Sequence, residues 1–173
     1  MSLDRKYWLT AVCCAAVFSV PVLVQGASLA KADADFMNMA AKANMTEAHL
    51  GQMAEAQAGQ KQVKEFGQKL SQDHTTAYEG LSVLANKTGD SIPKAISKGK
   101  TIEQLTHLKG ARFDHAFLMD EVTSHKTELA AFQNEAEHGE NADVKAWAKS
   151  MIPTLQEQLQ QAETLAKPAK PAK

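Results

Sequence analysis

Apolar residues recur at helical spacing from residue 33 onward. Their period of about 3.6 residues divides the chain into four long amphipathic segments. These segments are rich in alanine, leucine, glutamate, lysine, glutamine and methionine, which all favour helices. The pattern predicts an all-α protein with helices over 33–58, 61–88, 110–138 and 142–166.

Glycine and asparagine mark the joints between these segments. Gly59, Gly89 and Gly139 are expected to close the first three helices, and Asn141 is a suitable N-cap for the fourth. The two short joints predict two antiparallel hairpins. Residues 89–109 form a longer connection with a short helix expected over 101–108, and its length permits either a link at one end of the molecule or a crossover along it.

The two predicted hairpins share a weak internal repeat. Each hairpin has a buried face that it cannot cover alone, so the two are expected to pack together as a four-helix bundle. The repeated residues are Leu50 with Leu129, Gly59 with Gly139, Val63 with Val144, and Phe66 with Trp147.

The first thirty residues have a different character from the rest. Charged residues at positions 4–6 precede an apolar run from Tyr7 to Val24, and small residues follow, which is the layout of a secretory signal. Cleavage fits after Ala30 or after Ala32, and we favour Ala30. An uncleaved anchor is the alternative, because about eighteen apolar residues just span a bilayer. Residues 1–30 are therefore predicted to direct export, to the periplasm or to an association with the outer membrane.

Export changes the meaning of the cysteines and the charge. Cys13 and Cys14 both lie in the apolar run, so no disulfide is expected in the mature chain. Removing residues 1–30 takes away two bases and one acid, which moves the formal charge from −1 to −2 and argues against nucleic acid as a partner. Residues 31–166 suit one domain. The segment 167–173, rich in lysine, proline and alanine, is predicted to be a disordered tail, with at most a weak contact to an anionic envelope surface.

Ionisable residues interrupt the apolar stripes near mid-helix. At a rise of 1.5 Å per residue, Glu47 and His74 lie at levels that differ by only about 4 to 5 Å, and His125 lies midway along its own helix. Carboxylates and imidazoles that converge in a helical bundle are the ligands of a carboxylate-bridged metal centre. The candidate ligands for iron or manganese are Glu47, Asp73, His74, Glu121 and His125.

A polar core without a metal explains the same residues. Buried acids and histidines can bond to one another and set the register of the helices. A complete di-iron pattern needs Glu-x-x-His on two helices, and the literal match here, Glu135 with His138, lies at a helix end where we expect solvent. Gln158 on the fourth helix is a poor ligand. The metal site and the structural network therefore remain alternatives.

A row of soft ligands lies on the first predicted helix. Met45, His49 and Met53 follow one another at intervals of four residues, a combination that suits Cu(I). Methionine at this spacing more often packs against other residues. Packing is therefore the favoured interpretation of the row.

Several short runs carry a family resemblance, and they extend over about residues 33–165. They are Ala34-Asp35-Phe36, Glu47-Ala-His-Leu-Gly51, Val63-Lys-Glu-Phe66, Asp73-His74, Phe113-Asp114, His125-Lys126 and Ile152-Pro153-Thr-Leu155. Together they resemble the bacterial domain-of-unknown-function family 4142. The resemblance implies an exported, ferritin-like protein of the kind often labelled an outer membrane protein, without a settled activity. That family tends to place a histidine after the proline of the last helix, where this chain has Gln158, which weakens a four-helix metal site.

Motifs of the common enzyme classes are missing from the mature sequence. It has no glycine-rich phosphate loop, nucleophile elbow, Cys-x-x-Cys or serine-histidine-aspartate constellation, so a hydrolase or transferase is disfavoured. The sequence favours a non-catalytic structural or interaction module of the bacterial envelope. The alternative is a ferritin-like protein that binds iron or manganese through the carboxylate and histidine cluster of its core.

Overall fold

The structure is a computed structural model that describes residues 29–96 and 99–167. The predicted signal segment up to residue 28, with both cysteines, lies outside the described residues, as does the lysine-rich tail from residue 168. The described part is helical and contains no strand. Its helices are α1 (Lys31–Gln57), α2 (Lys61–Thr88), α3 (Lys100–Thr106), α4 (Ala111–His138) and α5 (Ala142–Leu165). The all-α prediction is confirmed, including the short helix in the long connection.

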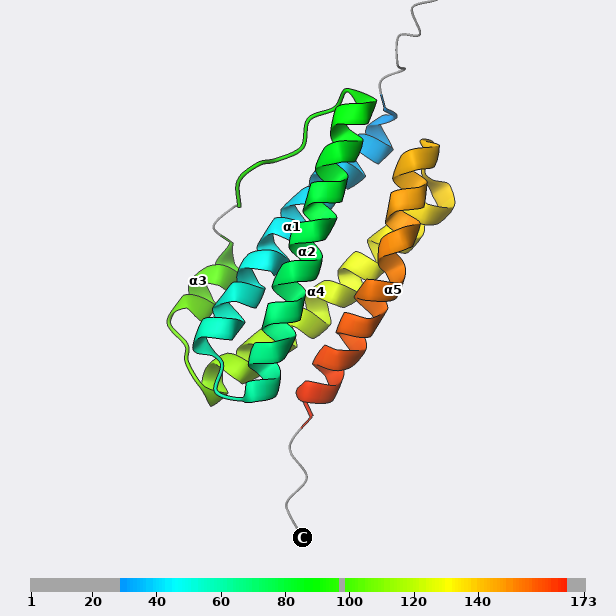
Figure 1. Cartoon of the computed structure of the whole chain (residues 1–173). Helices are drawn as coiled ribbons and strands as arrows, with labels where there is room; N and C mark the ends of the chain where they lie inside the picture. The colour runs from blue at the N-terminus through cyan, green and yellow to red at the C-terminus, as the bar shows by residue number, and fades with distance from the viewer. Residues whose placement is uncertain (1–28, 97–98, 168–173) are drawn as a thin grey trace, which may run out of the picture.

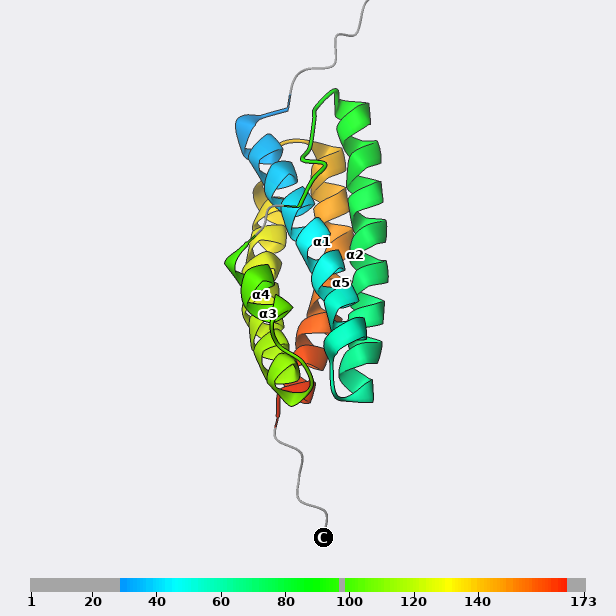
Figure 2. The same cartoon turned by 90° about the vertical axis from the view of Figure 1, so that its left-hand side faces the viewer.

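Four long helices lie side by side and the short α3 lies against one flank (Figure 1). The most extensive contacts join α1 to α2 and α4 to α5, which are the two predicted hairpins. Further contacts join α1 to α4 and α2 to α5. Figure 2 shows the four long helices as an elongated bundle, with α4 on one side, α2 on the other, α1 in front between them and α5 behind.

The long connection runs along the molecule. α2 ends at the end opposite the α1–α2 joint, and α4 begins back beside that joint (Figure 1). A backbone bond from Gly110 N to Gln57 O, 2.9 Å long, fixes this position. The connection is therefore a crossover, and α2 and α4 point in the same direction.

Capping residues explain where the helices end. Gly89 closes α2 in the left-handed conformation, with φ of 75°, where a residue with a side chain would be strained. The side chain of Asn141 accepts bonds from Asp143 N (3.0 Å) and Val144 N (3.2 Å), which confirms its predicted role as the N-cap of α5. Ala58, in an extended conformation, takes the C-cap position of α1 that was expected for Gly59.

Two buried aspartates join the hairpins at opposite ends. Asp114, in the first turn of α4, accepts bonds from Gly59 N (2.9 Å) and Gln60 N (3.1 Å) at the α1–α2 joint. Asp33, in the first turn of α1, does the same for two N–H groups of the α4–α5 joint, those of Glu140 (3.0 Å) and Asn141 (2.7 Å). Each hairpin thus caps the joint of the other.

These reciprocal bonds refine the internal repeat. Asp33 and Asp114 are 81 positions apart, and the same separation relates Gly59 to Glu140 and Gln60 to Asn141. The sequence comparison had matched Gly59 with Gly139, one position earlier. The tertiary bonds give both hairpins one constant register, in which Glu47 corresponds to Glu128.

The hydrophobic core has two parts. One gathers around Phe36 and Phe132 near the α4–α5 joint, and the other gathers around Phe66 and Phe117 near the α1–α2 joint. Between them the buried positions are largely polar. We call this middle part the polar layer, and its buried polar residues are Asn44, Glu47, His74, Glu121, His125, Glu128 and Gln158. Within residues 29–96 and 99–167, no helix has the length and apolar character needed to cross a bilayer.

Candidate metal centre

Three predicted ligands meet in the polar layer. Glu47 from α1 and Glu121 and His125 from α4 each offer one ligand atom, and these atoms lie within 4.8 Å of one another. All three residues are buried, with exposed fractions of 2% for Glu47 and 0% for the other two. Two oxygen ligands and one nitrogen ligand thus face a single point that is shielded from water.

Glu128 adds a third carboxyl group, so the carboxylate cluster consists of Glu47, Glu121 and Glu128. Burial raises the pKa of Glu121 and of Glu128 well above the usual range, and the charge of nearby Glu47 raises both further. Carboxyl groups this close cannot all ionise without a compensating positive charge. Near neutral pH the cluster therefore holds protons or requires a cation.

Donor groups are scarce around this cluster. Oε2 of Glu47 and both carboxyl oxygens of Glu121 are buried without a hydrogen-bond donor among the described residues. Nδ1 of His125 lies 3.3 Å from Oε2 of Glu121, but its hydrogen bond is directed to the backbone oxygen of the same residue at 3.0 Å. Buried polar atoms normally have partners, so unpaired oxygens at the centre of the molecule point to a ligand or to shared protons.

His125 is oriented by an outer layer of hydrogen bonds. Nε2 of Gln158 donates to Asp73 Oδ2 at 3.0 Å, which directs Oε1 of Gln158 toward Nε2 of His125 at 3.1 Å. Nε2 of His125 is then a donor. Nδ1 can bind a metal only in its unprotonated form, so it would have to give up its hydrogen bond to the backbone oxygen of Glu121. A histidine that binds a metal characteristically donates its other N–H to a group of this kind.

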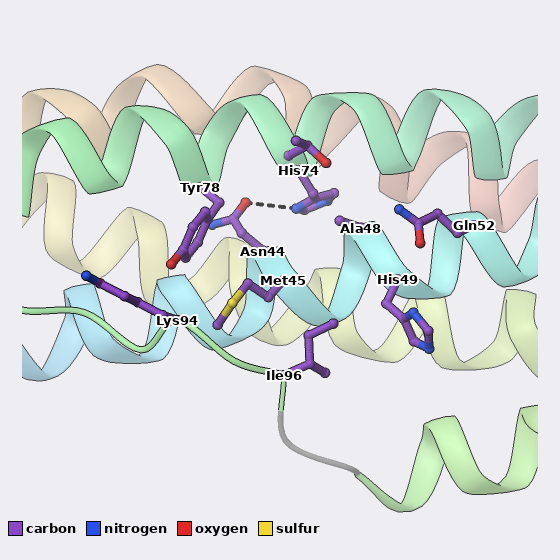
Figure 3. A pocket seen from close by; sticks show the side chains of 10 residues that line it. Asn44, Met45, Ala48, His49, Gln52, His74, Tyr78, Lys94 and Ile96 are labelled. Carbon is purple, nitrogen blue, oxygen red and sulfur yellow. Dashed lines mark hydrogen bonds between the residues drawn. The ribbon is translucent and has the colours of Figure 1, made fainter.

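His74 lies beside the cluster with its ring edge-on to that of His125, the centroids 5.7 Å apart. Its Nδ1 is 2.9 Å from Oδ1 of Asn44, whose amide nitrogen donates to Ala40 O at 2.8 Å, so Nδ1 carries the proton (Figure 3). Nε2 is buried without a partner. Burial lowers the pKa of His74 to about 4, so the ring is neutral near pH 7.

Asp73 lies apart from the three converging ligands. Its partly exposed carboxylate accepts bonds from Lys69 Nζ (2.8 Å) and from Gln158 Nε2 (3.0 Å). The predicted set of five is thus divided: Glu47, Glu121 and His125 converge, His74 adjoins them, and Asp73 supports them through Gln158.

Two acids were misplaced or missed by the sequence analysis. Glu135 was expected in solvent, but only 4% of it is exposed, whereas His138 is exposed as expected. Glu128 was passed over because the neighbouring Leu129 seemed to define the buried stripe. A usable signal was present: four of the acids of α4 recur every seven residues and are buried, namely Asp114, Glu121, Glu128 and Glu135.

The row of soft ligands on α1, Met45, His49 and Met53, does not lie in one shared environment. Met45 and His49 line a cavity of about 370 Å³ between α1, α2 and the connection, together with Ile96 (Figure 3). Met53 instead packs in the apolar core near the α1–α2 joint. The row therefore does not place three soft ligands in a common cavity.

Comparison with known proteins identifies the family. The family profile described as "Domain of unknown function (DUF4142)" matches residues 20–165. The chain belongs to the DUF4142 family. No curated protein matches this DUF4142 chain significantly.

Solved structures similar to this DUF4142 protein share its fold at low sequence identity. A DUF305 fragment from Deinococcus radiodurans aligns with a TM-score of 0.71 and 11% identity, covering 80% of this chain and 97% of the fragment. CopM in its Cu(I)-bound form aligns with a TM-score of 0.66 and 14% identity, covering 76% of this chain and 93% of CopM. CopM in its Cu(II)-bound form gives 0.67 and 13%, covering 78% and 95%. At such identities these structures establish similarity of fold alone.

Proposed function

We propose that this DUF4142 protein is an exported, ferritin-like helical bundle of the bacterial envelope that binds a divalent cation, iron or manganese, in its polar layer. One observation carries the proposal: Glu47, Glu121 and His125 offer ligand atoms within 4.8 Å of one another, and the acids have oxygens that no donor satisfies. An uncompensated charge buried in this way costs on the order of several kcal/mol. A cation removes that cost.

The ligand chemistry favours a hard or borderline metal. Carboxylate oxygens suit manganese, and oxygen combined with imidazole nitrogen suits iron. Glu47, Glu121 and His125 would hold the cation, Glu128 lies within reach of Glu47, and Gln158 would orient His125 from outside. Iron or manganese at this place supplies one-electron redox chemistry when bound.

Topology and the N-terminal sequence support the rest of the proposal. A bundle of two hairpins joined by a single long crossover is the connectivity of ferritin-like proteins. The apolar run of residues 7–24, with charges before it and small residues after it, supports export. Export places the domain in the periplasm or at the outer membrane.

A second candidate function is a structural or interaction module without a metal. It is favoured by the raised pKa of Glu121 and Glu128, because protonated carboxyl groups can donate to Glu47 and satisfy the cluster without a cation. The two candidates differ in one measurable property. A metal must displace these protons, so the affinity of a metal site rises with pH.

Thermal unfolding with added metal ions tests the proposal. The panel contains Mn(II), Fe(II) without oxygen, Zn(II) and Cu(I), the last because CopM is solved with copper bound. At a hundredfold excess of ligand over the dissociation constant, binding stabilises the folded protein by about 2.7 kcal/mol. We expect Mn(II) or Fe(II) to raise the melting temperature, and to do so more at pH 8 than at pH 6.

Two matched variants show whether the effect arises in the polar layer. Glu121→Gln keeps the shape of a residue that burial already favours in its neutral form, so it is expected to fold but to lose the stabilisation by metal. Glu137→Gln makes the same chemical change at an exposed acid of the same helix, outside the polar layer, and is expected to retain it. No stabilisation of the wild-type protein by any metal, and no copurifying metal by elemental analysis, would leave the metal-free module as the function.

A further inference from the structure

The cluster is sealed on most sides. Glu121, His125 and Gln158 are 0% exposed and His74 is 1% exposed. Aromatic pairs block access to the cluster along the bundle axis from both ends. The ring centroids are 5.0 Å apart in the pair Phe36–Phe132 and 6.0 Å apart in the pair Phe66–Phe117. A cation cannot reach the cluster through these parts of the folded molecule.

A cavity between α1 and α4 reaches the cluster from one side. It has a volume of about 560 Å³, and it is lined by Glu47 and Glu128 together with two further charged residues of α1, Asp35 and Lys42. Glu128 is the most exposed member of the cluster, at 8%, and Oε2 of Glu47 is buried there without a donor. A shell of six waters at about 30 Å³ each takes up roughly 180 Å³, so the cavity has room for a hydrated ion.

The opposite side of α1 offers no equivalent passage. The cavity there is lined by Asn44 and His74 but by none of the three acids of the cluster. Asn44 and His74, which both line that cavity, are hydrogen-bonded to each other through Nδ1 of His74. The two cavities therefore flank the same helix, and one of them opens onto carboxyl groups.

We propose that the cavity between α1 and α4 is the entrance for a hydrated divalent cation, and that Glu128 is the first carboxylate of the cluster to bind it. This inference rests on the proposed function and adds the route by which the metal arrives. Ala43 and Thr46 of α1 line the cavity beside Glu47. A hard cation exchanges its water for carboxylate oxygens as it moves inward, which suits a path that begins in water and ends at acids.

Two alanines of α1 allow a matched test, because both are half-buried and each lines one of the two cavities. Ala43 lines the proposed entrance, and Ala48 lines the cavity beside His74. We expect Ala43→Leu to slow both the uptake of Mn(II) and its release to a fluorescent chelator by about tenfold, the effect of a barrier raised by 1.4 kcal/mol. Because a narrowed route changes both rates equally, the equilibrium affinity should stay at the wild-type value. Ala48→Leu should change neither rate.

A charge variant provides a second test that does not depend on tight packing. Thr46→Lys places a cation at the entrance and should slow uptake most at low ionic strength, whereas Gln52→Lys, at the other cavity, should not. If Ala43→Leu and Thr46→Lys both bind Mn(II) normally at equilibrium and also take it up and release it at wild-type rates, the proposed route is wrong but the proposed function stands. The route would also be wrong if Ala48→Leu slowed the uptake and release of Mn(II) as strongly as Ala43→Leu. No equilibrium binding of Mn(II) by the wild-type protein would overturn the proposed function and the route together.

Discussion

Glu135 lies at the joint between α4 and α5, where its carboxyl group meets that of Asp33. Burial raises the pKa of Glu135 to about 7, the charge of Asp33 and a hydrogen bond to it act in the same direction, and Lys145 opposes them. A β-carbon on Gly139 would lie 2.3 Å from Oε1 of Glu135, so the acid fills the space beside the joint. Protonated Glu135 can donate to Asp33, whereas ionised Glu135 repels it.

This arrangement predicts that stability falls as the pH rises. The pKa of Glu135 is about 7 in the folded protein against 4.5 for a free side chain, so its contribution is complete below pH 4.5 and is lost as the pH rises through 7. This pKa shift of Glu135 corresponds to at most about 3 kcal/mol in the free energy of unfolding. Because water near the end of the molecule screens the charges, we expect about 1 to 2 kcal/mol.

Urea unfolding of Glu135→Gln at pH 5 and pH 8 measures the effect. The amide cannot ionise but can still donate to Asp33, so the variant should gain about 1 to 2 kcal/mol relative to the wild type between these two pH values. Glu137→Gln, an exposed neighbour on the same helix, is the control and should leave the pH dependence unchanged. An identical pH dependence in Glu135→Gln and the wild type would contradict the assignment.

At the scale of helices, α1 and α2 make their closest approach at two glycines. A β-carbon on Gly51 would lie 2.5 Å from Gly67 O, and one on Gly67 would lie 2.5 Å from Cβ of Ala54. Neither distance is sterically acceptable, so the two backbones touch here. The contact lies one turn from Glu47 and helps to set the height of α1 relative to α2.

We expect Gly67→Ala to destabilise the protein by about 1 to 3 kcal/mol, because the added methyl group forces the two helices apart. Gly80, in the same helix, is the matched control: a β-carbon there meets nothing closer than Trp147 Nε1 at 3.5 Å. Gly80→Ala should therefore stabilise α2 by about 0.5 to 1 kcal/mol, the usual benefit of alanine within a helix. Chemical unfolding of both variants gives the two free energies, and a neutral Gly67→Ala would show that the helices are less tightly packed than described.

For the whole molecule, the hairpins are held together at both ends by Asp33 and Asp114. Each carboxylate binds two backbone N–H groups of the other hairpin, across 54 to 55 positions for Asp114 and 107 to 108 for Asp33. Both acids are buried, with exposed fractions of 0% for Asp33 and 2% for Asp114. The bonds therefore stabilise the association of the hairpins rather than either hairpin alone.

Asp114→Ala leaves the N–H groups of Gly59 and Gln60 without an acceptor, and we expect a loss of about 2 to 3 kcal/mol in the free energy of unfolding. Asp35→Ala removes an acid near the start of α1 that forms an exposed pair with Lys31, so it should cost less than about 0.5 kcal/mol. Denaturant titrations of the two variants check the difference. Equal losses in both would mean that the bonds across the hairpins add little.

Part of the site could be predicted from the sequence because residues three or four positions apart lie on the same face of a helix. Glu47, Glu121 and His125 each stand where an apolar stripe should continue, and mid-helix positions placed them at similar levels. Glu128 was passed over because it borders an apolar residue, and one helix alone cannot show which of two adjacent positions its neighbours cover. Glu135 was expected in solvent because it lies at a helix end, and only the other hairpin buries it. Asp73 borders the buried face in the same way, but it lies at the edge, where Lys69 and Gln158 reach it.

The helices, the two hairpins and the caps Gly89 and Asn141 were determined by the sequence alone, since periodicity and capping act between residues a few positions apart. Tertiary structure alone decided the crossover, the constant register of the two hairpins and the burial of Glu128. Each of these depends on contacts between residues far apart in the chain, such as Gly110 with Gln57 and Asp33 with Asn141. Pattern within a helix tells which side is apolar, but only the packing of the hairpins determines which polar groups share the space between them.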